Sequence, residues 1–176
     1  MSVFVANEQS DHPIDERALA SLARLAMRAE GVQESEVSIL LVDRTAMAGL
    51  NGRYLGATGP TDVLAFPIDE PDQPYGPPRG PNSSRSLDEL DEDADDLGDE
   101  ADDAEPWLLG DVVLCPSFAA EQARAAGQSL EAELELLTVH GILHLCGLDH
   151  ADPEEDAAMR ARTAELLATW RSRERP

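Results

Sequence analysis

The chain has no lysine, only two cysteines and no long hydrophobic run among its 176 residues, and these absences exclude several classes of protein. Two cysteines are too few for the disulfide framework of a small secreted domain. No apolar run reaches the roughly 18 residues that a membrane-spanning helix needs. Residues 1–9 show no basic-then-apolar signal pattern. We therefore expect a cytoplasmic protein with reduced thiols and no membrane association.

Basic residues are scarce as well. The chain has 36 aspartates and glutamates against 13 basic residues, all of them arginine, and its formal net charge is -23. Residues 69–105 alone contain 15 acids and two arginines. A protein of this charge has no general attraction to the phosphates of nucleic acid. Any binding of nucleic acid therefore has to depend on local contacts.

Length and composition predict a single folded domain. A chain of 176 residues with 42% hydrophobic residues can bury a substantial core. The exception is the stretch at about 70–106, first rich in Pro, Gly and Ser and then in Asp and Glu, which has too few large apolar groups to offset the entropy of ordering. We expect one folded domain over 1–176 with a disordered acidic insertion at about 70–106. A tolerated surface insertion is favoured over a nucleic-acid mimic that gates the site.

Hydrophobic periodicity predicts four strands and about five helices. The strands are expected at 3–6, 36–42, 63–66 and 108–115, and the helices at 13–30, 44–54, 116–126, after Ser129 and after Asp152. Asp43, Ser129 and Asp152 are suitable helix caps. The helix after Ser129 is apolar on nearly every side, so we expect it to run through the centre of the domain.

Three histidines in the segment 140–150 have the spacing of metal ligands. His140 and His144 are four residues apart, which places them on one helix face about 6 Å apart along the axis. Gly147 is expected to end the helix and turn the chain, bringing His150 toward this pair. Three neutral imidazoles with one open position are typical of a catalytic zinc site. The spacing therefore predicts one zinc ion per chain, and histidines packed in the core are the alternative.

The residue after the first histidine separates this motif from a similar one in peptidases. Metzincin peptidases share the spacing but have glutamate directly after the first histidine, where this chain has Gly141. That glutamate is the general base which deprotonates water in such enzymes. A metzincin-like peptidase is therefore the less favoured interpretation.

The motif from His140 to His150, His-Gly-Ile-Leu-His-Leu-Cys-Gly-Leu-Asp-His, resembles that of the YbeY-type family of bacterial rRNA maturation endoribonucleases. Two other segments agree with the resemblance. Residues 59–67, Gly-Pro-Thr-Asp-Val-Leu-Ala-Phe-Pro, are similar to the family's P-T-D-V-L-S-F-P segment, and residues 109–114 are similar to its L-G-D-I-V-I strand. The order and spacing fit nearly the whole chain except the acidic insertion.

The resemblance implies a fold and a function. The fold is an α+β domain with a small mixed four-stranded sheet, about five helices and a central buried metal-binding helix. The implied metal ligands are His140, His144 and His150. The implied activity is a single-strand-specific metallo-endoribonuclease acting in 16S rRNA 3′-end maturation and ribosome quality control. Its implied partners are ribosomal RNA and the small ribosomal subunit, with a ribosomal protein as a further candidate, and the oligomeric state stays open.

Further site residues follow from this interpretation. A zinc ion would lower the pKa of bound water and polarise a phosphoryl oxygen, and Asp149 is a candidate to orient a histidine ligand. Many family members have arginine directly after the aromatic residue that precedes the P-T-D segment, whereas this chain has Leu55. Arg53 is the nearest cation for a catalytic phosphate contact, and Thr61 and Asp62 are candidates for substrate binding. Leu55 supports the alternative of a non-catalytic ribosome assembly factor with a structural metal.

Overall fold

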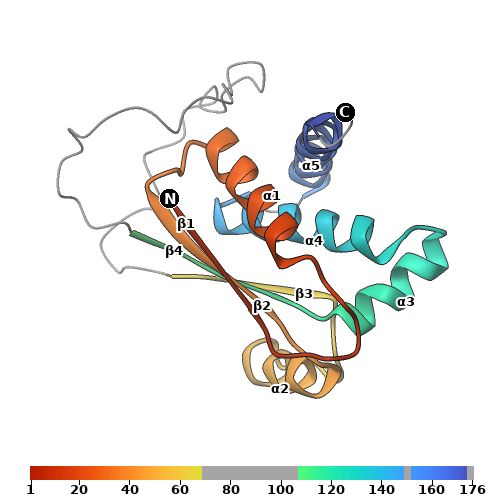
Figure 1. The fold of residues 1–176 in the computed structure, drawn as a ribbon. Helices are drawn as coiled ribbons and strands as arrows, with labels where there is room; N and C mark the ends of the chain where they lie inside the picture. The colour runs from red at the N-terminus through yellow and green to blue at the C-terminus, as the bar shows by residue number, and fades with distance from the viewer. Residues whose placement is uncertain (69–106, 149–151, 174–176) are drawn as a thin grey trace.

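The computed structural model describes residues 1–68, 107–148 and 152–173. These residues form four strands and five helices, with two strand–helix pairs first, then two strands in succession and three helices at the end (Figure 1). In chain order they are β1 (Ser2–Asn7), α1 (Glu16–Ala29), β2 (Ser35–Leu41), α2 (Arg44–Leu55), β3 (Val63–Pro67), β4 (Trp107–Leu114), α3 (Pro116–Ala126), α4 (Leu130–Leu145) and α5 (Pro153–Arg173). The acidic insertion predicted at about 70–106 lies outside the described residues.

The four strands form one mixed sheet in the order β1-β2-β4-β3. β1, β2 and β4 are parallel, whereas β3 is antiparallel to β4. The predicted α+β fold with a small mixed four-stranded sheet and about five helices is therefore confirmed. β3 is the edge strand next to β4, so one of its sides has no neighbouring strand within the described residues.

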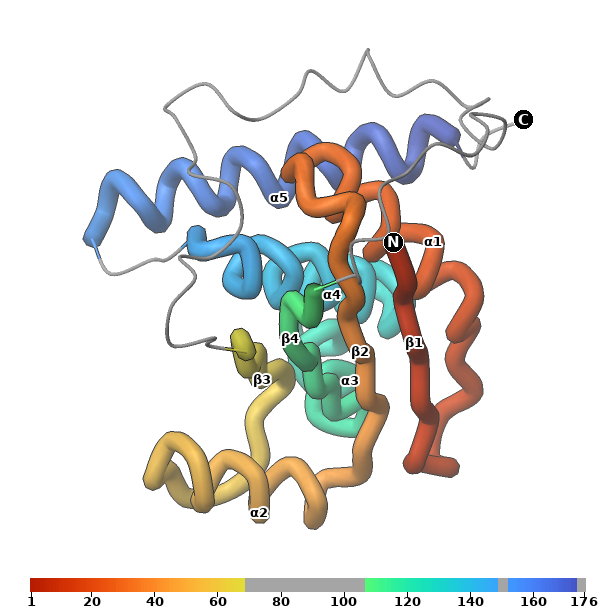
Figure 2. Tube along the Cα trace, turned by 90° about the vertical axis from the view of Figure 1, so that its left-hand side faces the viewer, coloured from red at the N-terminus to blue at the C-terminus, as the bar shows by residue number. Residues whose placement is uncertain are grey.

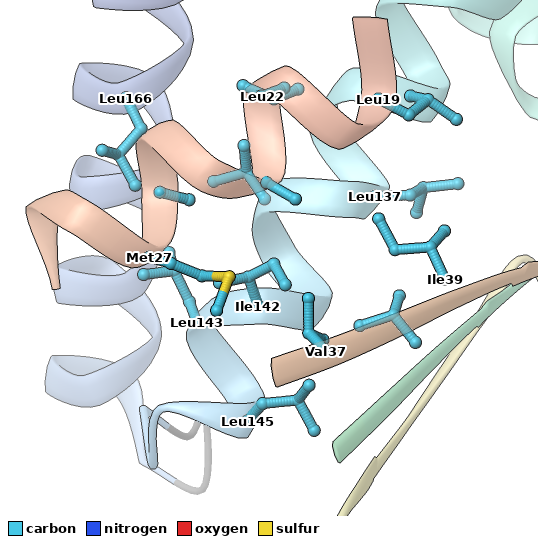
Figure 3. Close-up of a cluster of buried hydrophobic side chains, with 14 of the residues drawn as sticks. Leu19, Leu22, Met27, Val37, Ile39, Leu137, Ile142, Leu143, Leu145 and Leu166 are labelled. Atoms are coloured by element: carbon cyan, nitrogen blue, oxygen red, sulfur yellow. The ribbon is translucent and has the colours of Figure 1, made fainter. Parts of the chain in front are cut away.

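The helix α4 lies at the centre of the fold. It packs against α1, α3 and α5 as well as against β3 and β4. Figure 3 shows Leu137, Ile142 and Leu143 of α4 between the side chains of α1 and those of β2. Ile142 and Leu143 are completely buried, and each fully buried side chain of this size contributes roughly 1.5–3 kcal/mol through the hydrophobic effect. The burial of these side chains holds α4 rigidly in place, and with it the residues on the face of α4 that is not covered by other elements.

Close packing of α4 on the sheet requires a glycine. A Cβ atom added at Gly141 would lie 2.7 Å from Val112 Cγ1 of β4 and 3.0 Å from its Cγ2. Valine is β-branched and has little freedom to move its methyl groups aside. The absence of a side chain at Gly141 thus sets how closely α4 approaches β4.

The helix α2 packs on the other side of the sheet. Its Met47 is completely buried in a second, smaller cluster that also contains Leu64 of β3 and Val113 of β4. Val112, the neighbour of Val113, belongs instead to the main core under α4. Because side chains alternate between the two faces of a strand, α2 and α4 cover opposite faces. Figure 2 shows α2 at the end of the strands that is remote from α5.

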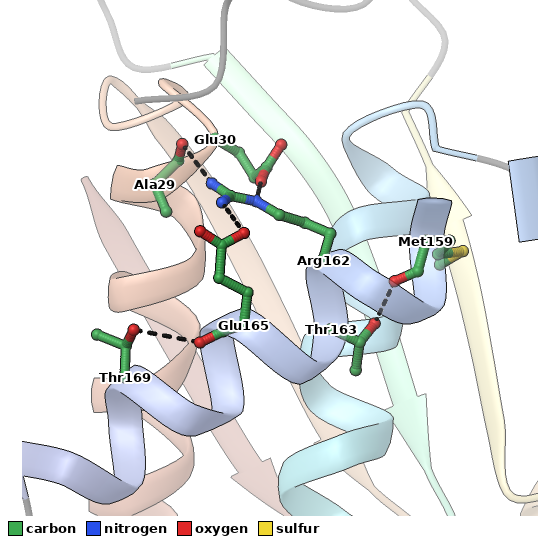
Figure 4. A network of polar contacts seen from close by, with 7 residues as sticks. All are labelled: Ala29, Glu30, Met159, Arg162, Thr163, Glu165 and Thr169. Atoms are coloured by element: carbon green, nitrogen blue, oxygen red, sulfur yellow. Dashed lines mark hydrogen bonds and ion pairs between the residues drawn. The ribbon is translucent and has the colours of Figure 1, made fainter. Parts of the chain in front are cut away.

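The helix α5 is tied to α1 by a buried ion pair (Figure 4). Arg162 Nε donates to Glu30 Oε1 over 2.7 Å, and the same guanidinium donates to the backbone oxygen of Ala29 and to Glu165. The side chains of Arg162 and Glu30 are only 13% and 2% exposed. Burial opposes the charge of the guanidinium, but the hydrogen bonds to Glu30 and Glu165 outweigh it and raise the pKa of Arg162.

Candidate active site

A cleft of about 1300 Å³ opens between α4, β3, α3 and the C-terminal end of α2. Its floor includes one face of α4, and its walls include the edge strand β3. The residues that line it are Tyr54, Leu55, Asp62, Val63, Leu64, Ala65, Phe66, Pro67, Gln122, Ala125, Ala126, Glu133, Leu136, Leu137, His140, Gly141, His144, Gly147 and Leu148. The cleft thus combines a largely apolar lining with a few polar groups, as is usual in ligand sites.

His140 and His144 lie side by side in this cleft. Their ring centroids are 4.7 Å apart and the ring planes are nearly perpendicular, at 87°. Both side chains are half-buried, and both project from the face of α4 that lines the cleft. The spacing of four residues therefore brings the two imidazoles together as the sequence predicts, close enough to bind one ion.

The helix α4 ends at Leu145, one residue after the second histidine. Gly147 has a φ of 82°, and its N–H donates to the carbonyl oxygen of His144 over 2.8 Å. The N–H of Leu148 donates to the carbonyl oxygen of Leu143 over 3.0 Å. These two bonds form a Schellman motif, which needs a residue with positive φ at the position of Gly147. The predicted end of the helix at this glycine is confirmed.

The third predicted ligand, His150, and the neighbouring Asp149 lie outside the described residues. Their roles as metal ligand and catalytic residue stay predictions. Within residues 1–68, 107–148 and 152–173, no three side chains of His, Cys, Asp or Glu come together as a complete metal site. The described part of the candidate site is the pair His140 and His144.

Asp62 lies on the wall of the cleft, at the start of β3. Its Oδ1 accepts hydrogen bonds from Thr61 Oγ1 over 2.9 Å and from the N–H of Val63 over 2.8 Å. Thr61 is not among the residues that line the cleft. The two predicted substrate-binding residues therefore differ in position: Asp62 faces the cleft, and Thr61 fixes the carboxylate of Asp62.

Glu133 is a cleft residue that was not predicted from the sequence. It projects from α4 into the same cleft as the histidines. Burial, together with the negative charge of Asp62, raises the pKa of Glu133 above the ordinary value. In the sequence, Glu133 is one of two acidic residues in the first turn of its helix, a position where the helix dipole favours negative charge. The signal that marks it is its position seven residues before His140, which puts both on one helix face.

The structure places Leu55, not Arg53, in the cleft. Leu55 is the last residue of α2 and its side chain is 65% exposed. The guanidinium carbon of Arg53 lies 5.4 Å from the centroid of the Tyr54 ring, and Arg53 is not among the lining residues. The predicted catalytic contact between Arg53 and phosphate stays a prediction.

Neither cysteine faces the cleft. Cys115 is completely buried, and burial raises the pKa of its thiol. Cys146 is also buried, at the C-terminal cap of α4. A thiol with a raised pKa in an apolar environment is a weak nucleophile. The chemistry of the described cleft therefore rests on imidazoles and carboxylates.

Comparison with known proteins assigns the family. The family model described as Endoribonuclease YbeY matches residues 4–171 of the chain. The chain belongs to the YbeY family. Its YbeY relatives include proteins named Endoribonuclease YbeY from Salinispora tropica and Thermobifida fusca. The first is 50% identical over 98% of both chains, and the second is 45% identical over 97% of this chain and 95% of the relative.

A solved structure supports the fold. A protein from Thermotoga maritima, known from a solution structure, superposes with a TM-score of 0.54 and 23% sequence identity. The match covers 98% of this chain and 93% of the other. Among the described residues of this YbeY-family chain, no helix is both long and apolar enough to span a membrane.

Proposed function

We propose that this member of the YbeY family is a metal-dependent endoribonuclease. Its substrate is single-stranded RNA, and its role is 16S rRNA 3′-end maturation and ribosome quality control. The observation that carries the proposal is the pair of imidazoles of His140 and His144, 4.7 Å apart in an open cleft. Membership of a family described as endoribonucleases supports the same reaction.

The donor atoms of the site suit zinc. His140 and His144 present two imidazoles on one rigid helix face, and the helix ends shortly after them, where Gly147 adopts a positive φ. We propose that His150 supplies a third imidazole and that one zinc ion binds per chain, because three protein ligands are usual for catalytic zinc. When bound, such an ion would act as a Lewis acid toward the phosphodiester and lower the pKa of water.

The chain's own residues determine where RNA enters the cleft. Asp62 and Glu133 line one part of it, and Glu133 precedes His140 by two helical turns. Their carboxylates repel phosphate, so a bound strand is directed toward the end with the histidines. The buried faces of α4 keep the imidazoles in position, and such preorganisation reduces the cost of reaching the transition state.

The proposed partners follow from the proposed substrate. They are ribosomal RNA and the small ribosomal subunit, with a ribosomal protein as a further candidate, in the cytoplasm. With a formal net charge of -23, the chain has to reach this RNA through local contacts instead of general electrostatic attraction.

One observation favours a second candidate function, a non-catalytic ribosome assembly factor with a structural metal. Leu55 provides an exposed apolar side chain to the cleft at a position where many family members have arginine. A peptidase is disfavoured because position 141 has a glycine in place of the glutamate that acts as general base in such enzymes. The packing of Gly141 against Val112 leaves no space for a glutamate side chain there.

Incubation of the purified protein with single-stranded RNA and, separately, with an unfolded protein separates these functions. The proposal predicts that the wild type cleaves RNA, that His144→Ala does not, and that His12→Ala cleaves as the wild type does. His12 is a suitable control because it lies outside the cleft. Cleavage of the protein substrate would support the peptidase, and inertness toward both substrates would support the assembly factor.

A further inference from the structure

Two aromatic rings from different elements meet in the lining of the cleft. Tyr54, near the end of α2, and Phe66, on β3, have ring centroids 4.9 Å apart and an interplanar angle of 58°. Both line the cleft that contains His140 and His144. The contact is of the tilted kind that aromatic pairs prefer.

The two rings differ in their exposure. Phe66 is partly buried against the small core cluster around Met47, so its position is fixed by packing. Tyr54 belongs to neither core cluster and is 55% exposed, even with Phe66 beside it. The ring of Tyr54 is therefore exposed to solvent but held in position by its contact with Phe66. Such a ring is a suitable surface for stacking of another planar group.

Charge in the cleft limits what can hold a polyanion there. Among the described residues, no arginine lines the cleft, whereas the acids Asp62 and Glu133 do. Arg53 borders this wall, with its guanidinium carbon 5.4 Å from the centroid of the Tyr54 ring. Apart from the proposed metal ion, the described lining therefore offers phosphate little attraction, and contacts with the bases would add to the binding of a nucleic acid.

We propose that Tyr54, supported by Phe66 and bordered by Arg53, is a stacking platform for an unpaired base of single-stranded RNA. This inference rests on the proposed function and names the residues that select its substrate. Stacking of a base on an aromatic side chain contributes about 1–3 kcal/mol and tolerates any sequence. A base inside a duplex has both faces covered by its neighbours, so the platform discriminates against paired RNA.

The test compares two fluorescent probes by anisotropy with the full-length protein. One is a short single-stranded oligoadenylate, and the other has the same length and phosphates but abasic sites in place of the bases. The wild type is expected to bind the oligoadenylate about tenfold more tightly, as one stacked base would give. Gel analysis of the probe after each titration confirms that it has stayed intact.

Substitutions test whether the preference for the oligoadenylate over the abasic probe depends on the ring of Tyr54. Tyr54→Ala and Tyr54→Leu are expected to bind the two probes equally, whereas Tyr54→Phe keeps the preference. Phe4→Ala is the matched control, because Phe4 is an equally exposed aromatic residue, at 59%, that lies on β1 and outside the cleft. Arg53→Ala is expected to weaken the binding of both probes equally. It should also reduce the slope of the logarithm of the binding constant against the logarithm of salt concentration by about 0.7, the value for one phosphate contact.

Equal binding of both probes by the wild type, or a base preference that survives in Tyr54→Leu, would overturn the platform. Binding of neither probe would overturn it as well. RNA cleavage by the same samples separates this inference from the function on which it rests. Cleavage without a base preference would refute the platform alone, whereas a preference that depends on Tyr54, with no cleavage, would refute only the catalytic function.

Discussion

Gly141 stands between the two histidines in the sequence, and a Cβ atom added there would lie against Val112 of β4. A side chain there would have to displace a stiff, completely buried valine. We expect Gly141→Ala to lower the free energy of unfolding by about 1–3 kcal/mol, the usual cost of overpacking a core. Denaturant unfolding measures this change.

Gly49→Ala is the control for that substitution. Gly49 is also inside a helix, but a Cβ atom there would meet nothing within 4 Å. Alanine is favoured over glycine in a helix interior by about 1 kcal/mol, so this variant should be at least as stable as the wild type. Equal effects of the two substitutions would show that packing against Val112 is not the reason for glycine at 141.

Glu133 gives the site a dependence on pH. Burial and the charge of Asp62 raise the pKa of Glu133, so the folded state binds its proton more tightly than the unfolded state does. This carboxylate therefore lowers stability at pH values above the raised pKa. We expect Glu133→Gln to be more stable than the wild type at neutral pH. The difference should shrink as the pH falls through the raised pKa and vanish below about 4.5, the ordinary glutamate value.

Thermal unfolding of both proteins across this pH range measures the difference. Glu131→Gln is the matched control, because Glu131 is in the same helical turn but is exposed and outside the cleft. The free energy of unfolding of Glu131→Gln should be about 0.3–1 kcal/mol lower than that of the wild type at neutral pH, because this variant loses only the favourable interaction with the helix dipole. A loss of the same size in Glu133→Gln would contradict the assignment of Glu133 to an unfavourable, partly buried position.

At the residue scale, the sequence predicted contacts within one helix but not contacts between elements. The distance between His140 and His144 follows from helix geometry alone, and so does the turn at Gly147. The contact between Tyr54 and Phe66 depends on how α2 lies relative to β3, which no local pattern specifies. Glu133 was missed because its interaction with Asp62 joins residues that are 71 positions apart in the chain.

A buried ion pair joins α5 to Glu30, the C-terminal cap of α1. Glu30 accepts a hydrogen bond from Arg162 and is almost fully buried, so removal of the arginine leaves a buried carboxylate without this cation. We expect Arg162→Ala to lower the free energy of unfolding by about 3–5 kcal/mol. Arg160→Ala, which removes an exposed pair with Asp156 on the same helix, should change it by less than about 0.5 kcal/mol.

Denaturant unfolding of the two arginine variants tests this difference. Similar small losses in both would show that Glu30 finds another partner when Arg162 is absent. The network in Figure 4 includes the backbone oxygen of Ala29, at the last residue of α1, so its loss should also loosen the end of that helix.

At the element scale, capping residues predicted helix starts well. Asp43 and Ser129 accept hydrogen bonds from the N–H groups of Ala46 and Ala132, and α2 and α4 begin directly after them. The first helix was predicted from Pro13 but begins at Glu16. Asp15 accepts from the N–H of Ala18 and is the actual cap. A proline can occupy the first turn of a helix, so the pattern allowed the earlier start.

At the scale of the whole molecule, the sequence predicted the number of strands and helices but not the order of strands in the sheet. β2 pairs with β1 on one side and with β4 on the other, and β3 joins the edge of β4 in the opposite direction. Such pairings depend on contacts between distant residues, and local propensity carries no information about them. The mixed character of the sheet was available only through the resemblance to the family.

The proposed role of His140 and His144 as ligands of a catalytic metal predicts the metal content of the protein. Mass spectrometry of gently purified protein should find one zinc ion per chain in the wild type and in His12→Ala, and none in His144→Ala. The samples that contain zinc, the wild type and His12→Ala, should cleave single-stranded rRNA fragments, and His144→Ala should not. Zinc lost from His144→Ala without cleavage by any sample would contradict the catalytic role, and a wild type without metal would contradict the site itself.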